Sequence, residues 1–307
     1  MAVVVLCVLG GCQSIDATDV PAEIDSTDVP AEIDSTDVPA EIDSTDVPAE
    51  EESAGEEAEQ AYVVSPDPAQ VTEIPEDFGS LEDAGFAKFT TVFDVPVVAT
   101  PEVSDRTIFH VRSVLADYLD NDEDGVADNP RVVYALQRSN AVAAVFVTFD
   151  EHEVWDSRDG GGTAEPYNLM TMVEEETDPA YGFDASLEEV LHLVTELGFA
   201  LAYPEELGET GDTGLVRALE QAQGTGDFFY DDPTCDPRCQ ATEYFYWAIT
   251  SNMGLQEERC DEISQEWALC NPERLAERNP AFVDLLENPE FRLPTVSPDG
   301  QYEPARP

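Results

Sequence analysis

Basic residues are scarce in this chain of 307 residues, which has 13 lysines and arginines against 68 aspartates and glutamates and a formal net charge of -55. Lysine occurs only once, as Lys88. Residues 13–60 hold 17 of the acids and no base, so residues 61–307 keep 51 acids and all 13 bases. An acidic surface repels the phosphates of nucleic acids and attracts cations. The composition therefore predicts no nucleic-acid partner.

Long apolar runs are also lacking. The N-terminal run "MAVVVLCVL" is too short to cross a membrane and stay there, and it ends in small residues and a cysteine, which is the order of a secretion signal. The closing "LGGC", Leu9–Cys12, resembles the end of a bacterial lipoprotein signal, and Gln13 after it resembles the outer-membrane-sorted kind. The resemblance implies a signal peptide at 1–11, a membrane-bound lipid on Cys12, and a location in the cell envelope, at the outer membrane or cell surface. The alternative is an uncleaved N-terminus.

Aromatic residues are absent from the segment that follows, where "IDSTDVPAE" recurs from Ile15, Ile24, Ile33 and Ile42, the first copy with Ala17 in place of serine. Each copy carries three carboxylates and one proline. Such a segment cannot bury enough apolar surface to offset the entropy of ordering it. We predict a disordered, solvated spacer over residues 12–75 and one folded domain over residues 76–307.

Cysteines number six, of which Cys7 would leave with the signal and Cys12 would carry lipid. The remaining four are Cys235, Cys239, Cys260 and Cys270. In an exported protein these four favour two disulfides, and the sequence leaves all three pairings open. A structural zinc site is the alternative, but its ligand pairs are normally spaced more tightly than Cys260 and Cys270.

The stretch "DNDEDGVAD" follows an amphipathic helical pattern and alternates aspartates around Gly125. Its first, third, fifth and ninth positions are Asp120, Asp122, Asp124 and Asp128. Alternate carboxylates can converge on one hard cation while the glycine permits the turn. The twelfth position, which holds a glutamate in an EF-hand, is Arg131, so the loop is closer to those of dockerin and thrombospondin-type repeats. We predict a structural calcium site; the alternative is an exposed acidic turn.

The stretch "SLEEVLHLVTELGFALAYP", Ser186–Pro204, reads as a buried helix with one of the three histidines of the chain. Glu188 lies four residues before His192, so the two share one helix face. This is the geometry of the HExxH zinc helix, in which two histidines hold the metal and the glutamate after the first is the general base. Glu188 here replaces the first histidine. We predict Glu188 and His192 as ligands, Glu189 as the base, and a capping box from Ser186 to Glu189.

A second helical stretch, "CQATEYFYWAITSNMGLQ", places Glu243 among apolar residues, where an acid needs a partner. We predict that Glu243 points at the first helix as a third ligand for zinc or another divalent metal, and that Tyr244 or Tyr246 stabilises an oxyanion. The alternative is a core histidine, with His192 hydrogen-bonded to Glu243 or Tyr246 and no metal.

Three further residues have less specific surroundings. We predict that His110 and His152 make solvent or carboxylate contacts, and that Glu196 lies either on an outer face or beside the metal. An apolar run of strand length, Ala141–Phe149, together with long helices, favours an α+β fold.

Together, "YLDNDEDGVADNP", "FDASLEEVLHLVT", "DDPTCDPRCQATEYFYWAITS" and "LPTVSPDGQY" resemble a group of exported zincin-like proteins, over roughly Glu82–Tyr302. The resemblance implies a zincin-like α+β domain, and Glu188 departs from the metallopeptidase pattern. Two functions follow: a tethered metallopeptidase-like hydrolase acting on a protein or peptide, or a non-catalytic, calcium-stabilised acidic surface protein used in adhesion.

Overall fold

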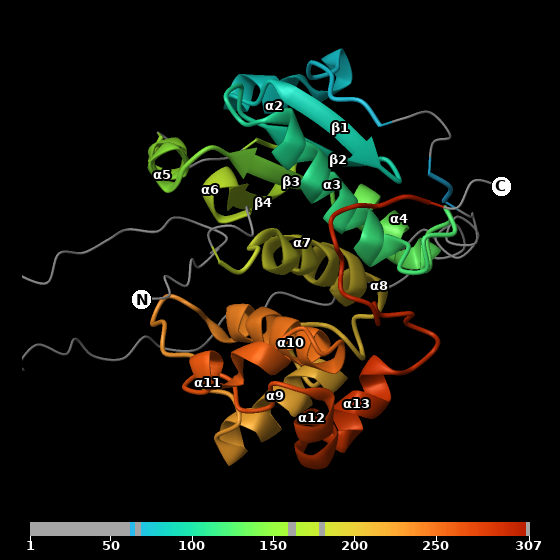
Figure 1. The fold of residues 1–307 in the computed structure, drawn as a ribbon, viewed down its shortest axis with the longest axis vertical. Helices are drawn as coiled ribbons and strands as arrows, with labels where there is room; N and C mark the ends of the chain where they lie inside the picture. The colour runs from blue at the N-terminus through green and yellow to red at the C-terminus, as the bar shows by residue number, and fades with distance from the viewer. Residues whose placement is uncertain (1–61, 65–68, 159–163, 178–181, 305–307) are drawn as a thin grey trace, which may run out of the picture.

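The computed structural model describes residues 62–64, 69–158, 164–177 and 182–304. These residues form a mixed α+β architecture with a four-stranded sheet, which confirms the predicted fold class (Figure 1). The predicted signal peptide, the repeats and Cys12 lie outside the described residues. Two contacts are made by residues that precede the predicted domain start at 76, since Val63 pairs with Val126 and Thr72 with Phe89. Within the described ranges no helix has the length and apolarity to cross a membrane.

The sheet has the order β1-β2-β3-β4, with β1 and β2 antiparallel and the other two pairs parallel. Its strands are β1 (Lys88–Val92), β2 (Val95–Ala99), β3 (Ala141–Phe146) and β4 (Asn168–Val173). β3 is buried along its whole length, as a continuous apolar run predicts for a strand covered on both faces. It ends at Phe146 rather than Phe149, because the Val147 N–H donates to Glu151 and Thr148 caps helix α5 (Phe149–Asp156).

Two helices connect the sheet to the acidic loop. α3 (Asp105–Leu119) begins where the Ser104 side chain accepts a hydrogen bond from Thr107 N and ends at Asp120. The apolar residues of its amphipathic pattern, which fall three or four positions apart, are buried: Ile108, Val111, Leu115 and Tyr118. α4 (Pro130–Arg138) follows the loop, and the Asn129 side chain caps it, with proline at its first position. The acidic loop is therefore held between two capped helices.

Helix α7 (Ser186–Val194) packs against α3 and the strand β4, and in Figure 1 it lies between the sheet and the lower helices. The predicted capping box is wrong: Ser186 is the first helical residue, and Asp184 accepts hydrogen bonds from both its N–H and its hydroxyl. The helix continues as a π-helical turn, η3 (Thr195–Phe199), and α8 (Ala200–Ala202). A side chain at Gly198 would collide with Val132 of α4, so this glycine allows the close approach of the two helices.

The remaining helices form the lower half of the molecule in Figure 1, apart from two N-terminal turns above the sheet and the short α6 beside β4. The lower helices are α9 (Gly214–Thr225), α10 (Pro237–Asn252), η4 (Glu257–Arg259), α11 (Cys260–Ile263), α12 (Pro272–Arg278) and α13 (Pro280–Leu286). The N-terminal turns are η1 (Glu76–Phe78) and α2 (Gly79–Ala84), and the short α6 (Glu174–Thr177) follows β4. α10 contacts α7, α9 and α12, so it is the central helix of this half.

The lower half contains two disulfides, as predicted, and the structure shows which cysteines pair. Cys235 bonds Cys239 at the start of α10, and Cys260 bonds Cys270. Both links are local, with sequence separations of 4 and 10 residues.

Candidate metal centre

The first turns of α7 present an acid and an imidazole toward α10. The apolar residues of α7 are buried in the core: Leu187, Val190, Leu191, Leu193 and Val194. This burial fixes the rotation of the helix and brings Glu188 and His192, four residues apart, onto one face. The His192 side chain is 4% exposed and that of Glu188 is 23% exposed, so the site opens toward solvent at Glu188.

Glu243 reaches the same point from α10. His192 Nε2 lies 3.7 Å from Glu243 Oε2 and 3.9 Å from Glu188 Oε1. One ligand atom from each of the three residues lies within 4.8 Å of the others. Ligand atoms about 2.0–2.2 Å from one tetrahedral ion are separated by about 3.3–3.6 Å. The group can therefore close around a metal ion with small side-chain movements.

The carboxylates around His192 favour a positive charge at this site, supplied either by protons or by a metal ion. Burial disfavours a charged His192, but the carboxylates of Glu243, Glu188 and Glu189 raise the pKa of its imidazolium to about 10. Burial raises the pKa of the Glu243 carboxyl to about 8, although the nearby His192 charge acts in the opposite direction. Without a metal ion the site therefore holds protons at neutral pH. A divalent ion would supply the same positive charge and would release those protons on binding.

The environment of His192 differs from the predicted core-histidine alternative. That interpretation requires a hydrogen bond to Glu243 or Tyr246, but Nε2 lies 3.7 Å from Glu243, beyond hydrogen-bonding distance. Its other nitrogen, Nδ1, is buried and has no hydrogen-bond partner among the described residues. Leaving a buried polar atom unpaired costs about 1–3 kcal/mol. The ring is therefore oriented by its carboxylate neighbours rather than by a hydrogen bond at Nδ1.

Of the two tyrosines predicted to stabilise an oxyanion, Tyr246 lies next to His192 and Tyr244 does not. The Tyr246 ring lies 5.5 Å from that of His192, and its hydroxyl accepts a hydrogen bond from Gln256. The hydroxyl of Tyr244 instead accepts a hydrogen bond from Asn279, within the lower core. Glu189, the predicted base, is buried, and its charge contributes to the raised pKa of His192.

Sequence reasoning missed Tyr230. Its hydroxyl is buried with no hydrogen-bond partner in the described part of the chain. Burial raises the pKa of this hydroxyl, and the negative charges of Glu243, Glu266 and Glu188 raise it further. Tyr230 lies in the connection between α9 and α10, where no periodic pattern marks it in the sequence.

The other singled-out residues have different surroundings. Glu196, on the π-helical turn, faces Arg238 at 3.4 Å, and burial together with Glu209 raises its pKa to about 6. His110 binds the Asp184 carboxylate at 2.6 Å. His152 packs edge-on against Phe146, and burial lowers its pKa.

The acidic loop forms a second group that could hold a cation, in which ligand atoms of Asp120, Asp122 and Asp124 lie within 4.8 Å of one another. Asp120 is fully buried and accepts hydrogen bonds from the N–H groups of Asp124 and Gly125. Gly125 has a φ of 87°, the left-handed conformation that its position in the motif requires. Asp128 is outside this group and accepts from Asn121 N at 2.7 Å, so its role as a ligand stays a prediction.

Both ends of the described chain meet at this loop. On the N-terminal side, Val64 N donates to Gly125 O and Ala127 N to Tyr62 O. On the C-terminal side, Asn121 accepts hydrogen bonds from Thr295 N and Val296 N, and the Tyr302 hydroxyl bonds Asp120. These contacts could not be predicted from local patterns, because the residues that make the C-terminal ones are 174 to 182 positions apart.

Comparison of the chain with protein-family models, curated proteins and solved structures finds no match. The site must therefore be interpreted from its own chemistry.

Proposed function

We propose that Glu188, His192 and Glu243 hold a divalent metal ion and that this ion serves a zincin-like hydrolase centre acting on a protein or peptide. The observation that carries the proposal is the convergence of one imidazole and two carboxylates, from α7 and α10, within 4.8 Å. The ion can be zinc or another divalent metal, because imidazole suits zinc whereas carboxylates also suit manganese and calcium.

The metal ion and the residues around it would have different roles in hydrolysis. A bound divalent ion supplies Lewis acidity to a substrate carbonyl. Glu189 follows Glu188 directly, as the general base follows the first ligand in a zinc helix, and would accept a proton from the attacking water. Tyr246 lies beside His192, and the Tyr230 hydroxyl is buried without a hydrogen-bond partner among the described residues. A buried hydroxyl is suited to stabilise a developing oxyanion.

The ligand charges limit how fast such a centre can work. Two carboxylate ligands neutralise a divalent ion and weaken it as a Lewis acid, compared with a site of neutral histidines. Slow hydrolysis is therefore expected, with tighter binding of hard cations than at a two-histidine site.

Metal analysis and assay of the purified full-length chain test this proposal. We expect one tightly held transition metal ion per chain in the presence of excess calcium, and peptide hydrolysis that chelation removes and the metal restores. Glu243→Gln should lose both the metal and the activity. Glu266→Gln is the matched control, because Glu266 accepts a hydrogen bond from Trp247 Nε1 nearby but is no ligand. Metal content that is unchanged in Glu243→Gln would refute the centre.

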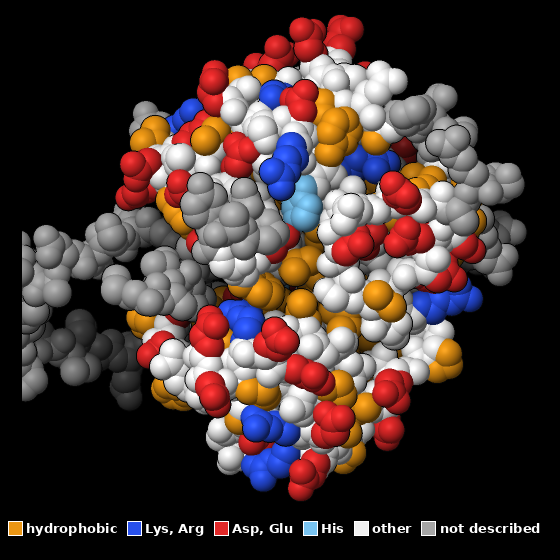
Figure 2. Space-filling model, viewed as in Figure 1, with side chains coloured by type: hydrophobic (Ala, Val, Ile, Leu, Met, Phe, Trp, Pro, Cys, Tyr) orange, Lys and Arg blue, Asp and Glu red, His pale blue; other side chains and the backbone are white. Residues whose placement is uncertain are grey.

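A second candidate function is favoured by the acidic loop. In it the protein is non-catalytic, and calcium at Asp120, Asp122 and Asp124 stabilises an acidic surface used in adhesion. The contacts of both chain ends with this loop support a stabilising role. Figure 2 shows acidic side chains above and below a middle region in which hydrophobic side chains are exposed. Wild-type protein that hydrolyses no peptide when loaded with metal would favour this function.

We also propose that the chain is exported and anchored to the outer membrane or cell surface by lipid on Cys12. The two disulfides support an oxidising compartment. Labelled fatty acid should be incorporated into the wild-type chain and not into Cys12→Ala; equal labelling would refute the anchor.

A further inference from the structure

One histidine outside the metal centre joins three separate segments. His110, on α3, places Nε2 2.6 Å from Asp184 Oδ2 and 3.3 Å from the Ser186 hydroxyl. The backbone of Gly300 lies against the ring and favours its protonated form. A Cβ added at Gly300 would collide with Nδ1 of this ring, and Gly300 has a φ of 70°. The contact therefore requires glycine.

Asp184 in turn fixes the start of the metal helix. Its Oδ1 accepts hydrogen bonds from Ser186 N at 3.0 Å and from the Ser186 hydroxyl at 2.6 Å, and its carbonyl accepts from Leu187 N at 3.1 Å. Asp184 and Ser186 are 8% and 0% exposed. Glu188 is the next residue of this first turn, so its backbone position depends on where Asp184 is held.

We propose that His110 is a positioning residue: bound to Asp184, it sets the first turn of α7 and thereby the affinity of the Glu188, His192 and Glu243 centre for its metal ion. This inference rests on the proposed metal centre. We call the contact between the two side chains the His110–Asp184 clamp.

The clamp depends on a proton. Nε2 of His110 faces the Asp184 carboxylate. A neutral imidazole has one N–H, which either nitrogen can carry, whereas the protonated ring always donates from Nε2. The hydrogen bond to Asp184 raises the pKa of His110; burial and the charge of Arg106, one turn earlier on α3, oppose this. The clamp is therefore complete at low pH and weakens as pH rises through the raised pKa.

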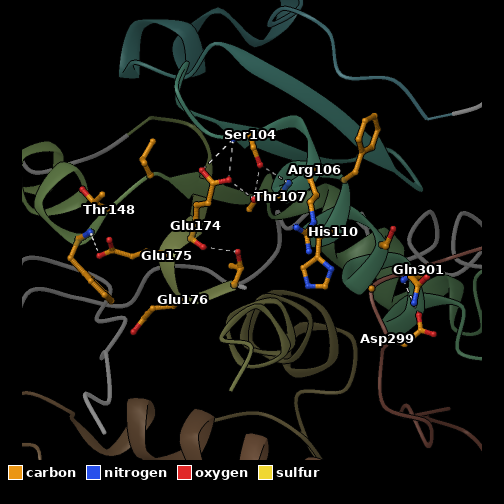
Figure 3. A pocket seen from close by; sticks show the side chains of 16 residues that line it. Ser104, Arg106, Thr107, His110, Thr148, Glu174, Glu175, Glu176, Asp299 and Gln301 are labelled. Carbon is orange, nitrogen blue, oxygen red and sulfur yellow. Dashed lines mark hydrogen bonds between the residues drawn. The ribbon is translucent and has the colours of Figure 1, made fainter. Parts of the chain in front are cut away.

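Protons can reach the clamp from solvent. His110 lines a pocket of about 1160 Å³ together with Arg106, Glu176, Asp299 and Gly300. Figure 3 shows Arg106 and His110 side by side on α3, with Glu174, Glu175 and Glu176 across the pocket. Glu174, Glu175 and Glu176 of α6 and Asp299 of the C-terminal segment are the other charged groups that line this pocket. Asp117, also on α3, accepts a hydrogen bond from Gly300 N.

Zinc affinity of the full-length chain, measured by competition with a chromophoric chelator in excess calcium, tests the clamp. His110→Gln should weaken zinc binding about tenfold at low pH. This is the lower end of the loss expected when a residue that supports the metal ligands, without binding the metal itself, is removed. The ratio of variant to wild-type dissociation constants should fall as pH rises from about 6 to about 10, because the neutral wild-type ring carries one proton fewer and binds Asp184 more weakly.

Two further variants keep the test decisive. Asp105→Asn removes an ion pair at the start of α3, with Lys88 at 2.7 Å, and should leave zinc affinity unchanged at every pH. Asp184→Asn keeps an acceptor for Ser186 and serves if His110→Gln does not fold; it should show the same pH-dependent ratio. If His110→Gln and Asp184→Asn bind zinc as tightly as the wild type, or if the ratio of dissociation constants does not change with pH, the role of the clamp is refuted and the metal centre still stands. A wild-type chain that binds no zinc would overturn the metal centre and the clamp with it.

Discussion

At the scale of single residues, Glu188 is the position at which the candidate centre differs most from a two-histidine zinc site. Replacing it with histidine would exchange a carboxylate for an imidazole four residues before His192 and lower the negative charge of the ligand set. We expect Glu188→His to bind zinc at least about tenfold more tightly, with a lower preference for hard cations. Zinc and manganese titrations of both proteins measure this change. Equal zinc affinity would show that residue 188 is not a ligand.

Asp117 gives a residue-scale prediction about pH. Its Oδ1 is buried without a hydrogen-bond partner in the described residues, while Oδ2 accepts from Gly300 N. Burial, with the charges of Glu123 and Asp299, raises its pKa from 3.8 to about 7. The folded protein therefore keeps a proton that the unfolded chain releases above about pH 4, and this stability is lost as pH rises through about 7.

Asp117→Asn should remove this loss, because asparagine stays neutral. The free energy of unfolding of the wild type should fall between pH 4 and pH 7 by an additional amount of up to about 4 kcal/mol, which the variant does not show. Urea unfolding of both proteins in chelator, at several pH values, measures the difference. Parallel pH profiles would mean that Asp117 is ionised in the folded state.

At the scale of elements, the two disulfides close loops of different length. In the chain-entropy description, a separation of 10 residues stabilises by about 2.7 kcal/mol and one of 4 residues by about 1.9 kcal/mol. We expect Cys260→Ser with Cys270→Ser to lower the free energy of unfolding more than Cys235→Ser with Cys239→Ser. Chemical denaturation of the two double variants compares them. The reverse order would show that native packing around each bridge, rather than loop entropy, dominates.

How far the sequence predicts this structure also depends on the element. Patterns that are local, such as the apolar face of α3, the central strand β3 and the four-residue spacing of Glu188 and His192, are recognisable because neighbouring residues determine them. The position of Glu243 could be inferred only from the cost of burying an isolated acid. The capping by Asp184, the π-helical turn at Gly198 and the place of Tyr230 could not, because distant packing determines each of them.

At the scale of the whole molecule, the acidic loop joins the two ends of the described chain, so a cation there should stabilise the entire domain. Calcium at a hundredfold excess over its dissociation constant adds about 2.7 kcal/mol to the free energy of unfolding. Asp122→Ala with Asp124→Ala should abolish this increase. Asp83→Ala with Asp261→Ala removes the same charge from exposed positions elsewhere and should retain it. If thermal melting of the loop variant still responds to calcium, the ion binds at another place.

The central claim, that Glu188, His192 and Glu243 share one metal ion, is tested most directly by a crystal structure of the protein grown with zinc, with diffraction recorded on both sides of the zinc absorption edge. We expect an anomalous peak about 2.0–2.2 Å from His192 Nε2 and from a carboxylate oxygen of Glu188 and of Glu243. A map without a peak at this point, in which His192 Nε2 instead donates a direct hydrogen bond to Glu243, would contradict it.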